Sequence, residues 1–170
     1  MHKEVKRFCQ SIKSLHALHF MQTSVLDCGS LDINGNNRYL FENCIYMGVD
    51  IVEGKNVDIV TRVNDLKIDF QFDCVMSTEM LEHDEFYAES LKTMFTLTSP
   101  GGLILITAAG YGREEHGTHQ MKPQDSPLTR DYYCNVSVQM LLQGLDLTQF
   151  SWYIISFVKN DIQFAGIKNL

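Results

Sequence analysis

The sequence lacks an excess of positive charge. Its 170 residues include 14 lysines and arginines against 21 aspartates and glutamates, which gives a formal net charge of −7 at pH 7. Nucleic-acid binding depends on a basic surface that neutralises phosphates, so this balance argues against nucleic acid as a main partner. It does not exclude a local basic patch.

Long apolar runs are also missing. No segment approaches the roughly 20 consecutive apolar residues that a membrane-spanning helix needs. The basic residues Lys3, Lys6 and Arg7 are not followed by an uninterrupted apolar run, so the sequence predicts no signal peptide. We therefore expect a protein without a membrane partner.

Paired cysteines are absent as well. The five cysteines are odd in number and form no C-x-x-C pair. We interpret them as reduced, mostly buried thiols of a cytoplasmic protein, because three lie in apolar segments that resemble strands. Their spacing argues against a zinc site built from cysteine. The residues concerned are Cys9, Cys28, Cys44, Cys74 and Cys134.

What is present is enough apolar sequence for one core. Hydrophobic residues make up 45% of the chain, and no linker or repeat divides it, so we expect a single domain over residues 1–170, as a whole protein or as part of a longer one. An amphipathic helix is predicted over 3–20. Further helices are predicted over 36–43, 83–97 and 134–145, and strands over 24–28, 44–50, 57–60, 72–77 and 103–109.

Short apolar strands that alternate with helices indicate a parallel sheet covered on both faces. The chain ends differently, with two apolar segments, 152–158 and 162–168, that flank the turn "KND". A turn this short can only join antiparallel strands. The fold class we predict is α/β, a Rossmann-like, doubly wound and mostly parallel sheet of about seven strands with a C-terminal antiparallel hairpin.

The turn after the first strand reads "DCGSLDINGNNR". Ligands of doubly wound sheets bind outside the carboxyl ends of the strands, so this turn is the first candidate for a site. The glycine pattern G-x-G-x-x-G of dinucleotide-binding turns is absent, which disfavours a nicotinamide dehydrogenase. Asp27 and Asp32 make the turn a poor cradle for phosphate and a better host for a cation or an ammonium group.

Two further acidic residues follow neighbouring strands. Asp50 ends the second strand, 23 residues after Asp27. An acidic residue at this place commonly binds ribose hydroxyls. Asp65 follows the third strand in "NDL", where a carboxylate can accept a hydrogen bond from an adenine amino group.

Together these segments resemble the motifs of class I S-adenosylmethionine-dependent methyltransferases. "VLDCGSLDINGNNR" is similar to the first motif, D/E-x-G-x-G-x-G, and most closely to a subgroup with "GSLDxNG". "YMGVD", "NDL", "FDCVMSTEMLEH" and "SPGG" resemble the later motifs in their usual order, over roughly residues 24–109. The second and third glycines of the first motif are replaced.

The resemblance implies S-adenosylmethionine as cofactor and S-adenosylhomocysteine as product. It places the methionine end of the cofactor beside the first turn, the ribose on the second strand's acidic residue, the adenine after the second and third strands, and the sulfonium above the fourth strand. The cofactor-binding residues it implies are Asp27, Gly29, Ser30, Asp50, Ile51, Asp65, Leu66, Ser77, Thr78 and Glu79.

The segment 110–133 is long for a structureless connection, and such loops are often functional. In the resembling family it borders the acceptor pocket. Its histidines, together with one after the fourth strand, are candidate general bases, or alternatively solvated loop residues. The catalytic candidates are His116, His119 and His83, and the candidates for acceptor contacts are Asp32, Asn34, Tyr111, Asp131 and Tyr132.

A metal site from Glu114, Glu115, His116 and His119 is conceivable, but no recognised ligand spacing supports it, and we predict no metal. Because a hydroxyl acceptor needs its proton removed, the histidine-bearing loop favours O-methylation. The specific hypothesis is a sugar or glycan hydroxyl. The alternatives are methylation of a small metabolite or protein, and a cofactor-binding or regulatory module without activity.

Overall fold

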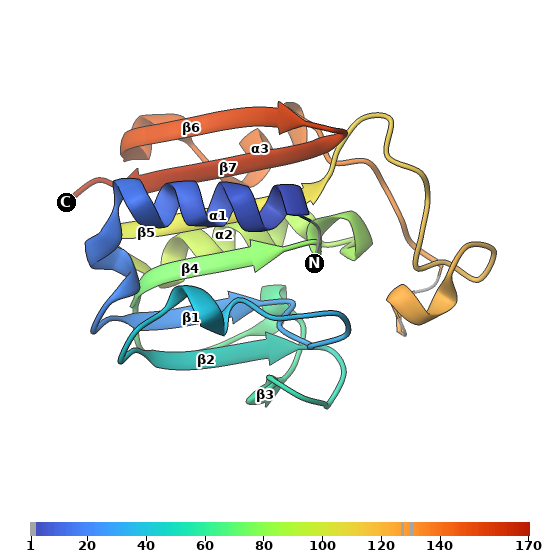
Figure 1. Ribbon diagram of the computed structural model, residues 1–170, viewed down its shortest axis with the longest axis horizontal. Helices are drawn as coiled ribbons and strands as arrows, with labels where there is room; N and C mark the ends of the chain where they lie inside the picture. The colour runs from blue at the N-terminus through green and yellow to red at the C-terminus, as the bar shows by residue number, and fades with distance from the viewer. Residues whose placement is uncertain (1–2, 127, 130) are drawn as a thin grey trace.

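The computed structural model describes residues 3–126, 128–129 and 131–170. Seven strands form one sheet in the order β3-β2-β1-β4-β5-β7-β6 (Figure 1). The strands are β1 Ser24–Cys28, β2 Ile45–Asp50, β3 Ile59–Val60, β4 Phe72–Thr78, β5 Thr98–Ala109, β6 Phe150–Val158 and β7 Asp161–Lys168.

The first five strands of the chain are parallel, and β7 lies antiparallel between β5 and β6. Lys159 and Asn160 close the hairpin with φ of +49° and +70°. Two consecutive residues with positive φ suit the right-handed twist of a two-residue hairpin. The predicted mostly parallel sheet with a C-terminal antiparallel hairpin is confirmed.

Helices cover both faces of the sheet. α1 (Lys3–Leu15) crosses one face and buries Val5, Phe8, Cys9 and Ile12 there, while α2 (Tyr87–Leu97) and α3 (Val138–Gly144) lie on the other face (Figure 1). The interior is accordingly two apolar clusters, one on each side of the sheet. Within the described ranges, no helix has the length and apolar character to cross a bilayer.

Helix ends differ from the predicted ones because local side chains fix them. α3 begins after Ser137, whose hydroxyl accepts the amide of Met140, so it starts later than predicted. Before α2, the Asp84 carboxylate accepts the amide of Phe86, which forms a turn where helix was predicted. The segment predicted as a helix over 36–43 is only the 3₁₀ turn η2, Arg38–Leu40.

β5 starts earlier than predicted, at Thr98, so the "SPGG" segment belongs to the strand. Its pairing with β4 shifts register between Phe72 and Cys74. Such an irregularity accommodates a proline and two glycines near a strand's start.

Residues 29–44, all within the described part of the chain, contain no α-helix. The turn after β1 lies at the carboxyl end of the sheet, and it is followed by the 3₁₀ turn η2 but by no α-helix before β2. The loop that follows β5 projects from the same end of the sheet (Figure 1).

Candidate functional site

A pocket of about 510 Å³ lies at the carboxyl ends of the parallel strands. Pockets that bind small molecules commonly have volumes of about 300–1,000 Å³. Its lining includes Asp27, residues 29–31 and 33–37 after β1, 50–52 after β2, 61–63 after β3, 78–80 after β4, and 112–116 after β5.

The turn after β1 is tied to the second strand. The amides of Gly29 and Ser30 both donate to the carbonyl of Val49, at 2.8 and 3.1 Å. The amide of Leu31 donates to Oδ2 of Asp50 at 3.0 Å, and the amide of Val52 donates to Oδ1 at 3.1 Å. These bonds fix the Asp50 carboxylate at the pocket wall, where its remaining lone pairs can accept hydroxyl groups.

Asp27 lies in β1, directly before this turn, and is 1% exposed. Tyr46 donates its hydroxyl to Oδ2, and Asn56 donates its amide to the same oxygen at 3.5 Å. Burial raises the pKa of Asp27 to about 6, although these donors act in the opposite direction. The site thus holds a desolvated carboxyl group beside the turn, which suits a cationic ligand.

Several cofactor-binding residues implied by the sequence line the pocket. The side-chain amide Nδ2 of Asn37 donates to Oγ1 of Thr78 at 3.0 Å and joins the turn after β1 to the end of β4. The lining residues of this group are Asp27, Gly29, Ser30, Asp50, Ile51, Thr78 and Glu79, and the acceptor candidate Asn34 joins them.

Three residues of the same group do not reach the pocket lining. Ser77 is fully buried, Leu66 packs in the core, and Asp65 faces solvent. The 3₁₀ turn η3 (Val63–Asp65) turns Val63 toward the pocket instead. Sequence reasoning missed Val63 because an apolar residue in this turn carries no signal of a site.

Four of the proposed acceptor contacts lie outside the described pocket lining. Asp32 accepts hydrogen bonds from Gly35 and Asn36 and pairs with Lys55 at 2.7 Å, which lowers its pKa to about 2. Tyr111 is 89% exposed. Of the other two, Asp131 is exposed and Tyr132 donates its hydroxyl to the sulfur of a neighbouring cysteine.

Two of the three candidate histidines come together in the pocket. The rings of His83 and His116 are edge to face with centroids 5.0 Å apart, and the ring of Tyr133 contacts both. Burial, reinforced by the nearby His116, lowers the pKa of His83 to about 4, so this ring is neutral near pH 7. His119 is turned away and pairs with the exposed Asp131 at 3.1 Å.

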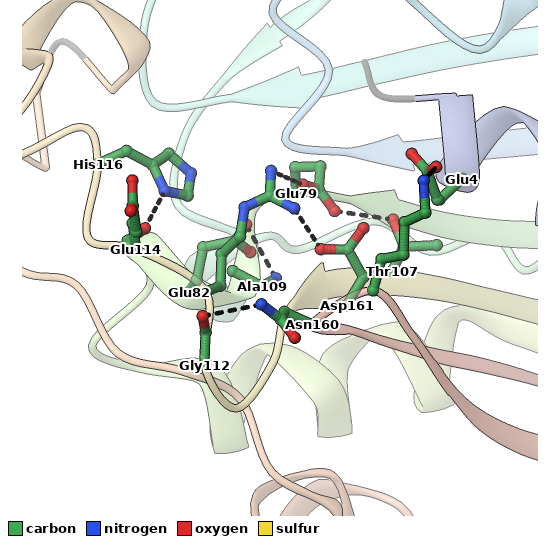
Figure 2. A network of polar contacts seen from close by, with 12 residues as sticks. Glu4, Glu79, Glu82, Thr107, Ala109, Gly112, Glu114, His116, Asn160 and Asp161 are labelled. Atoms are coloured by element: carbon green, nitrogen blue, oxygen red, sulfur yellow. Dashed lines mark hydrogen bonds and ion pairs between the residues drawn. The ribbon is translucent and has the colours of Figure 1, made fainter.

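A polar network that the sequence did not predict joins β4, β5 and the hairpin (Figure 2). Arg113 pairs with Asp161 at 2.6 Å and approaches Glu79 at 3.9 Å. Thr107 donates to Glu79, and the amide of Ala109 donates to Glu82 at 3.1 Å. Glu79 has φ of +58°, a conformation uncommon for a non-glycine residue and often found at functional sites.

Desolvation raises the pKa of both glutamates, that of Glu79 to about 7 and that of Glu82 well above its usual range. The resemblance implied Glu79 only as a cofactor-binding residue, and no role for Glu82 was expected from the sequence. Arg113 of the loop after β5 pairs with Glu79, and the amide of Cys134 donates to the carbonyl of Glu82, contacts between distant segments that sequence spacing cannot indicate.

No protein-family model matches the sequence, and no curated protein is significantly similar to it. Solved structures do match it. The 1,6-didemethyltoxoflavin-N1-methyltransferase of Burkholderia thailandensis, with bound 1,6-didemethyltoxoflavin and S-adenosylhomocysteine, superposes with a TM-score of 0.65 at 19% identity, over 98% of this chain and 79% of that one.

Two N-methyltransferases are also similar. Phosphoethanolamine N-methyltransferase 2 of Haemonchus contortus matches at TM-score 0.67 and 16% identity, over 97% of this chain and 53% of that one. NodS of Bradyrhizobium japonicum, in complex with S-adenosylhomocysteine, matches at 0.61 and 13%, over 96% and 86%. The chain therefore has the fold of S-adenosylmethionine-dependent methyltransferases.

Proposed function

We propose that this chain is an S-adenosylmethionine-dependent methyltransferase. The observation that carries the proposal is the pocket at the carboxyl ends of the strands, because its lining includes residues of three segments that resemble the family's motifs: the turn after β1, the end of β2 and the segment that ends β4. The turn after β1, the end of β2, and the ends of β3 and β4 line one cavity. Structural neighbours with bound S-adenosylhomocysteine support the same cofactor here.

In this proposal the ribose diol binds the Asp50 carboxylate, which backbone amides already orient. The adenine lies between Ile51 and Val63, both of which line the cavity. The methionine end lies by Gly29 and the buried Asp27. An acidic wall is favourable to a ligand that carries positive charge on its sulfonium and its amine.

The transfer itself needs alignment and a proton acceptor. The acceptor oxygen attacks the methyl carbon in line with sulfur, the carbon–sulfur bond breaks, and its electron pair stays on sulfur to give S-adenosylhomocysteine. The hydroxyl proton leaves to a base. Of the three candidate histidines, His83 and His116 line the pocket and are therefore the ones we propose at the acceptor end.

We propose a hydroxyl of a small molecule as the acceptor, with a sugar or glycan hydroxyl as the specific hypothesis. The support is the pair of imidazoles, because an amine acceptor needs less help to lose a proton. An amine is the second candidate. The named N-methyltransferases among the structural neighbours and the carboxylates in the pocket wall both favour it.

The first experiment is calorimetric titration with S-adenosylhomocysteine. We expect micromolar binding to the wild type, a loss of at least tenfold in Asp50→Ala, and unchanged binding in the control Asp69→Ala, whose side chain is exposed. Absence of binding to the wild type would overturn the proposal. Binding without turnover on any acceptor would favour the regulatory module that the altered glycine motif suggests.

The second experiment identifies the acceptor. Labelled S-adenosylmethionine is incubated with separate pools of sugars, glycans, phenols and amines, and the methyl carbon of any product is located by its chemical shift. An O-methyl product supports the hydroxyl hypothesis, and an N-methyl product replaces it with the amine.

A cytoplasmic location also remains our proposal, and the five free thiols support it.

A further inference from the structure

We propose that Glu82, His83 and His116 bind one divalent first-row transition-metal ion at the acceptor end of the pocket. Each offers one ligand atom, and these atoms lie within 4.8 Å of one another. The residues come from two separate segments, the 3₁₀ turn η4 (Leu81–His83) after β4 and the loop after β5. Two imidazoles and a carboxylate form a ligand set that suits Mn²⁺, Fe²⁺, Co²⁺ or Zn²⁺ better than Mg²⁺ or Ca²⁺.

The strongest support is a pair of unsatisfied buried atoms. Glu82 is 0% exposed, and its Oε1 accepts the amide of Ala109 at 3.1 Å. Its Oε2 has no hydrogen-bond partner among the described residues, and neither has Nδ1 of the buried His83. Leaving a buried acceptor unpaired costs free energy, so such groups need an explanation. One cation would satisfy both.

A backbone carbonyl orients the imidazole of His116. Nδ1 of His116 lies 3.1 Å from the carbonyl of Glu114, so it is a donor there and leaves Nε2 free (Figure 2). The backbone of Tyr132 also acts on the His83 imidazole and opposes the fall in its pKa, while Nδ1 of this ring has no hydrogen-bond partner among the described residues. Metal-binding histidines typically hold their second nitrogen as His116 does, since the bond fixes tautomer and ring orientation.

The loop is built to approach His83 closely. Gly117 has φ of +69°, and a Cβ there would lie 2.7 Å from Cε1 of His83. Three ligands bound about 2.0–2.2 Å from one ion lie roughly 3.0–3.5 Å apart, so binding requires the site to contract. His116 is only partly buried, so its side chain can move inward. The remaining coordination positions would be available to a ligand from the pocket.

Ordinary aromatic packing is the competing explanation. The ring contacts among His83, His116 and Tyr133, two of them edge to face and one tilted, are favourable by themselves. They do not explain why a fully buried carboxyl oxygen of Glu82 stands beside two imidazoles without a hydrogen-bond partner among the described residues. A nearby acidic side chain, Glu115, already accepts the hydroxyl of Thr118 and is engaged elsewhere.

The role of the ion rests on the proposed function, whereas its binding does not. If the acceptor is a hydroxyl, the ion would hold the acceptor oxygen and make its proton more acidic. The two imidazoles would then act through the metal, and the proton would leave to water at the pocket mouth.

The test uses the full chain, freed of metal with a chelator that is then removed. CoCl₂ is added without cofactor, and binding is followed by calorimetry and by the visible absorption of Co²⁺. We expect one equivalent to bind with micromolar affinity. His116→Ala and Glu82→Gln should each weaken binding at least 30-fold. His119→Ala is the matched control, because it removes an imidazole from the same loop but outside the ligand set.

Absence of saturable Co²⁺ binding to the wild type would overturn the proposal, and so would equal affinities in wild type and His116→Ala. S-adenosylhomocysteine titration of each metal-free protein reports separately on the fold and on the proposed function. Co²⁺ binding without cofactor binding would keep the metal site and reject the methyltransferase. His116 lies in a loop, so its variant tests the site even if Glu82→Gln fails to fold.

Discussion

Gly29 and Met80 meet so closely that a Cβ built on Gly29 would lie 2.6 Å from the Cβ of Met80. Gly29 also has φ of +77°, a conformation that other residues adopt only with strain. The contact brings the turn after β1 against the segment after β4, the two walls between which we place the reactive end of the cofactor.

Gly29→Ala should therefore displace one wall of the pocket. We expect a loss of about 1–2 kcal/mol in stability from the strained φ alone, and at least a tenfold loss of affinity for S-adenosylhomocysteine. Thermal unfolding and calorimetry measure the two effects. The double variant Gly29→Ala with Met80→Gly should be more stable than the sum of the two single effects predicts, because only glycine at position 80 removes the Cβ that the new methyl group would meet. A single variant with unchanged melting temperature and affinity would show that the turn adapts freely.

A second prediction concerns pH. The pKa of Asp27 is raised from its ordinary value of 3.8 to about 6, mainly by burial. The folded protein therefore binds more protons than the unfolded chain between about pH 4 and 6, so stability falls as pH rises through that interval. The shift corresponds to a loss on the order of 3 kcal/mol above pH 6.

The pH dependence of stability is measured by urea unfolding of the ligand-free wild type and of Asp27→Asn at pH 4 and pH 7.5. Asparagine keeps the size of the side chain but does not titrate. The stability of Asp27→Asn relative to the wild type should therefore be higher at pH 7.5 than at pH 4. The neighbouring groups that act on this carboxyl are Tyr46, Asn37, Asn56 and Arg38, and all of them stay in the variant. Parallel pH profiles would mean that Asp27 does not carry the effect.

A third prediction concerns the start of α3. Ser137 accepts the amide of Met140 at 3.2 Å, and a serine cap of this kind contributes about 1 kcal/mol. Ser137→Ala should lower the free energy of unfolding by that amount. Ser14→Ala is the control, because Ser14 donates to the carbonyl of Gln10 on an exposed helix face and should matter little. Equal effects in the two variants would argue against a capping role.

The strands were predictable because each is a short apolar segment, and their order along the chain indicated which carboxyl ends would share an edge. Asp27, Gly29 and Asp50 were placed correctly at that edge for the same reason. The ends of helices were less predictable. They depend on single hydrogen bonds, such as the one that Asp84 accepts from Phe86. The spacing of apolar residues along the sequence does not indicate such bonds.

The acceptor end was the hardest part to predict. His83 and His116 meet only because the loop after β5 returns over η4, and nothing in their spacing of 33 residues indicates that contact. The same loop exposes His119. Similarly, Val63 replaces Asp65 at the pocket because a 3₁₀ turn repeats every three residues, so which side chain faces inward depends on where the turn starts.

The last prediction concerns the base of that loop. Arg113 pairs with Asp161 at 2.6 Å, and the Asp161 side chain is 1% exposed. Removing one partner of a buried pair leaves the other charge uncompensated, which typically costs 3–5 kcal/mol. Because Arg113 is itself partly exposed, we expect Arg113→Met to cost on the order of 3 kcal/mol in chemical unfolding.

The control is Lys55→Met. Lys55 pairs with Asp32 at the similar distance of 2.7 Å, but its side chain is 78% exposed. Asp32 is only 8% exposed but keeps the hydrogen bonds from Gly35 and Asn36 in the variant, so the loss should stay within about 1 kcal/mol. The double variant Arg113→Met with Asp161→Asn should recover part of the lost stability, because it removes the charge that the single variant leaves buried. If Arg113→Met costs no more than Lys55→Met, the pair does not hold the loop, and its position depends on other hydrogen bonds, such as those that the Asn160 and Asn135 side chains donate to the carbonyls of Gly112 and Arg113 at 2.9 and 3.1 Å.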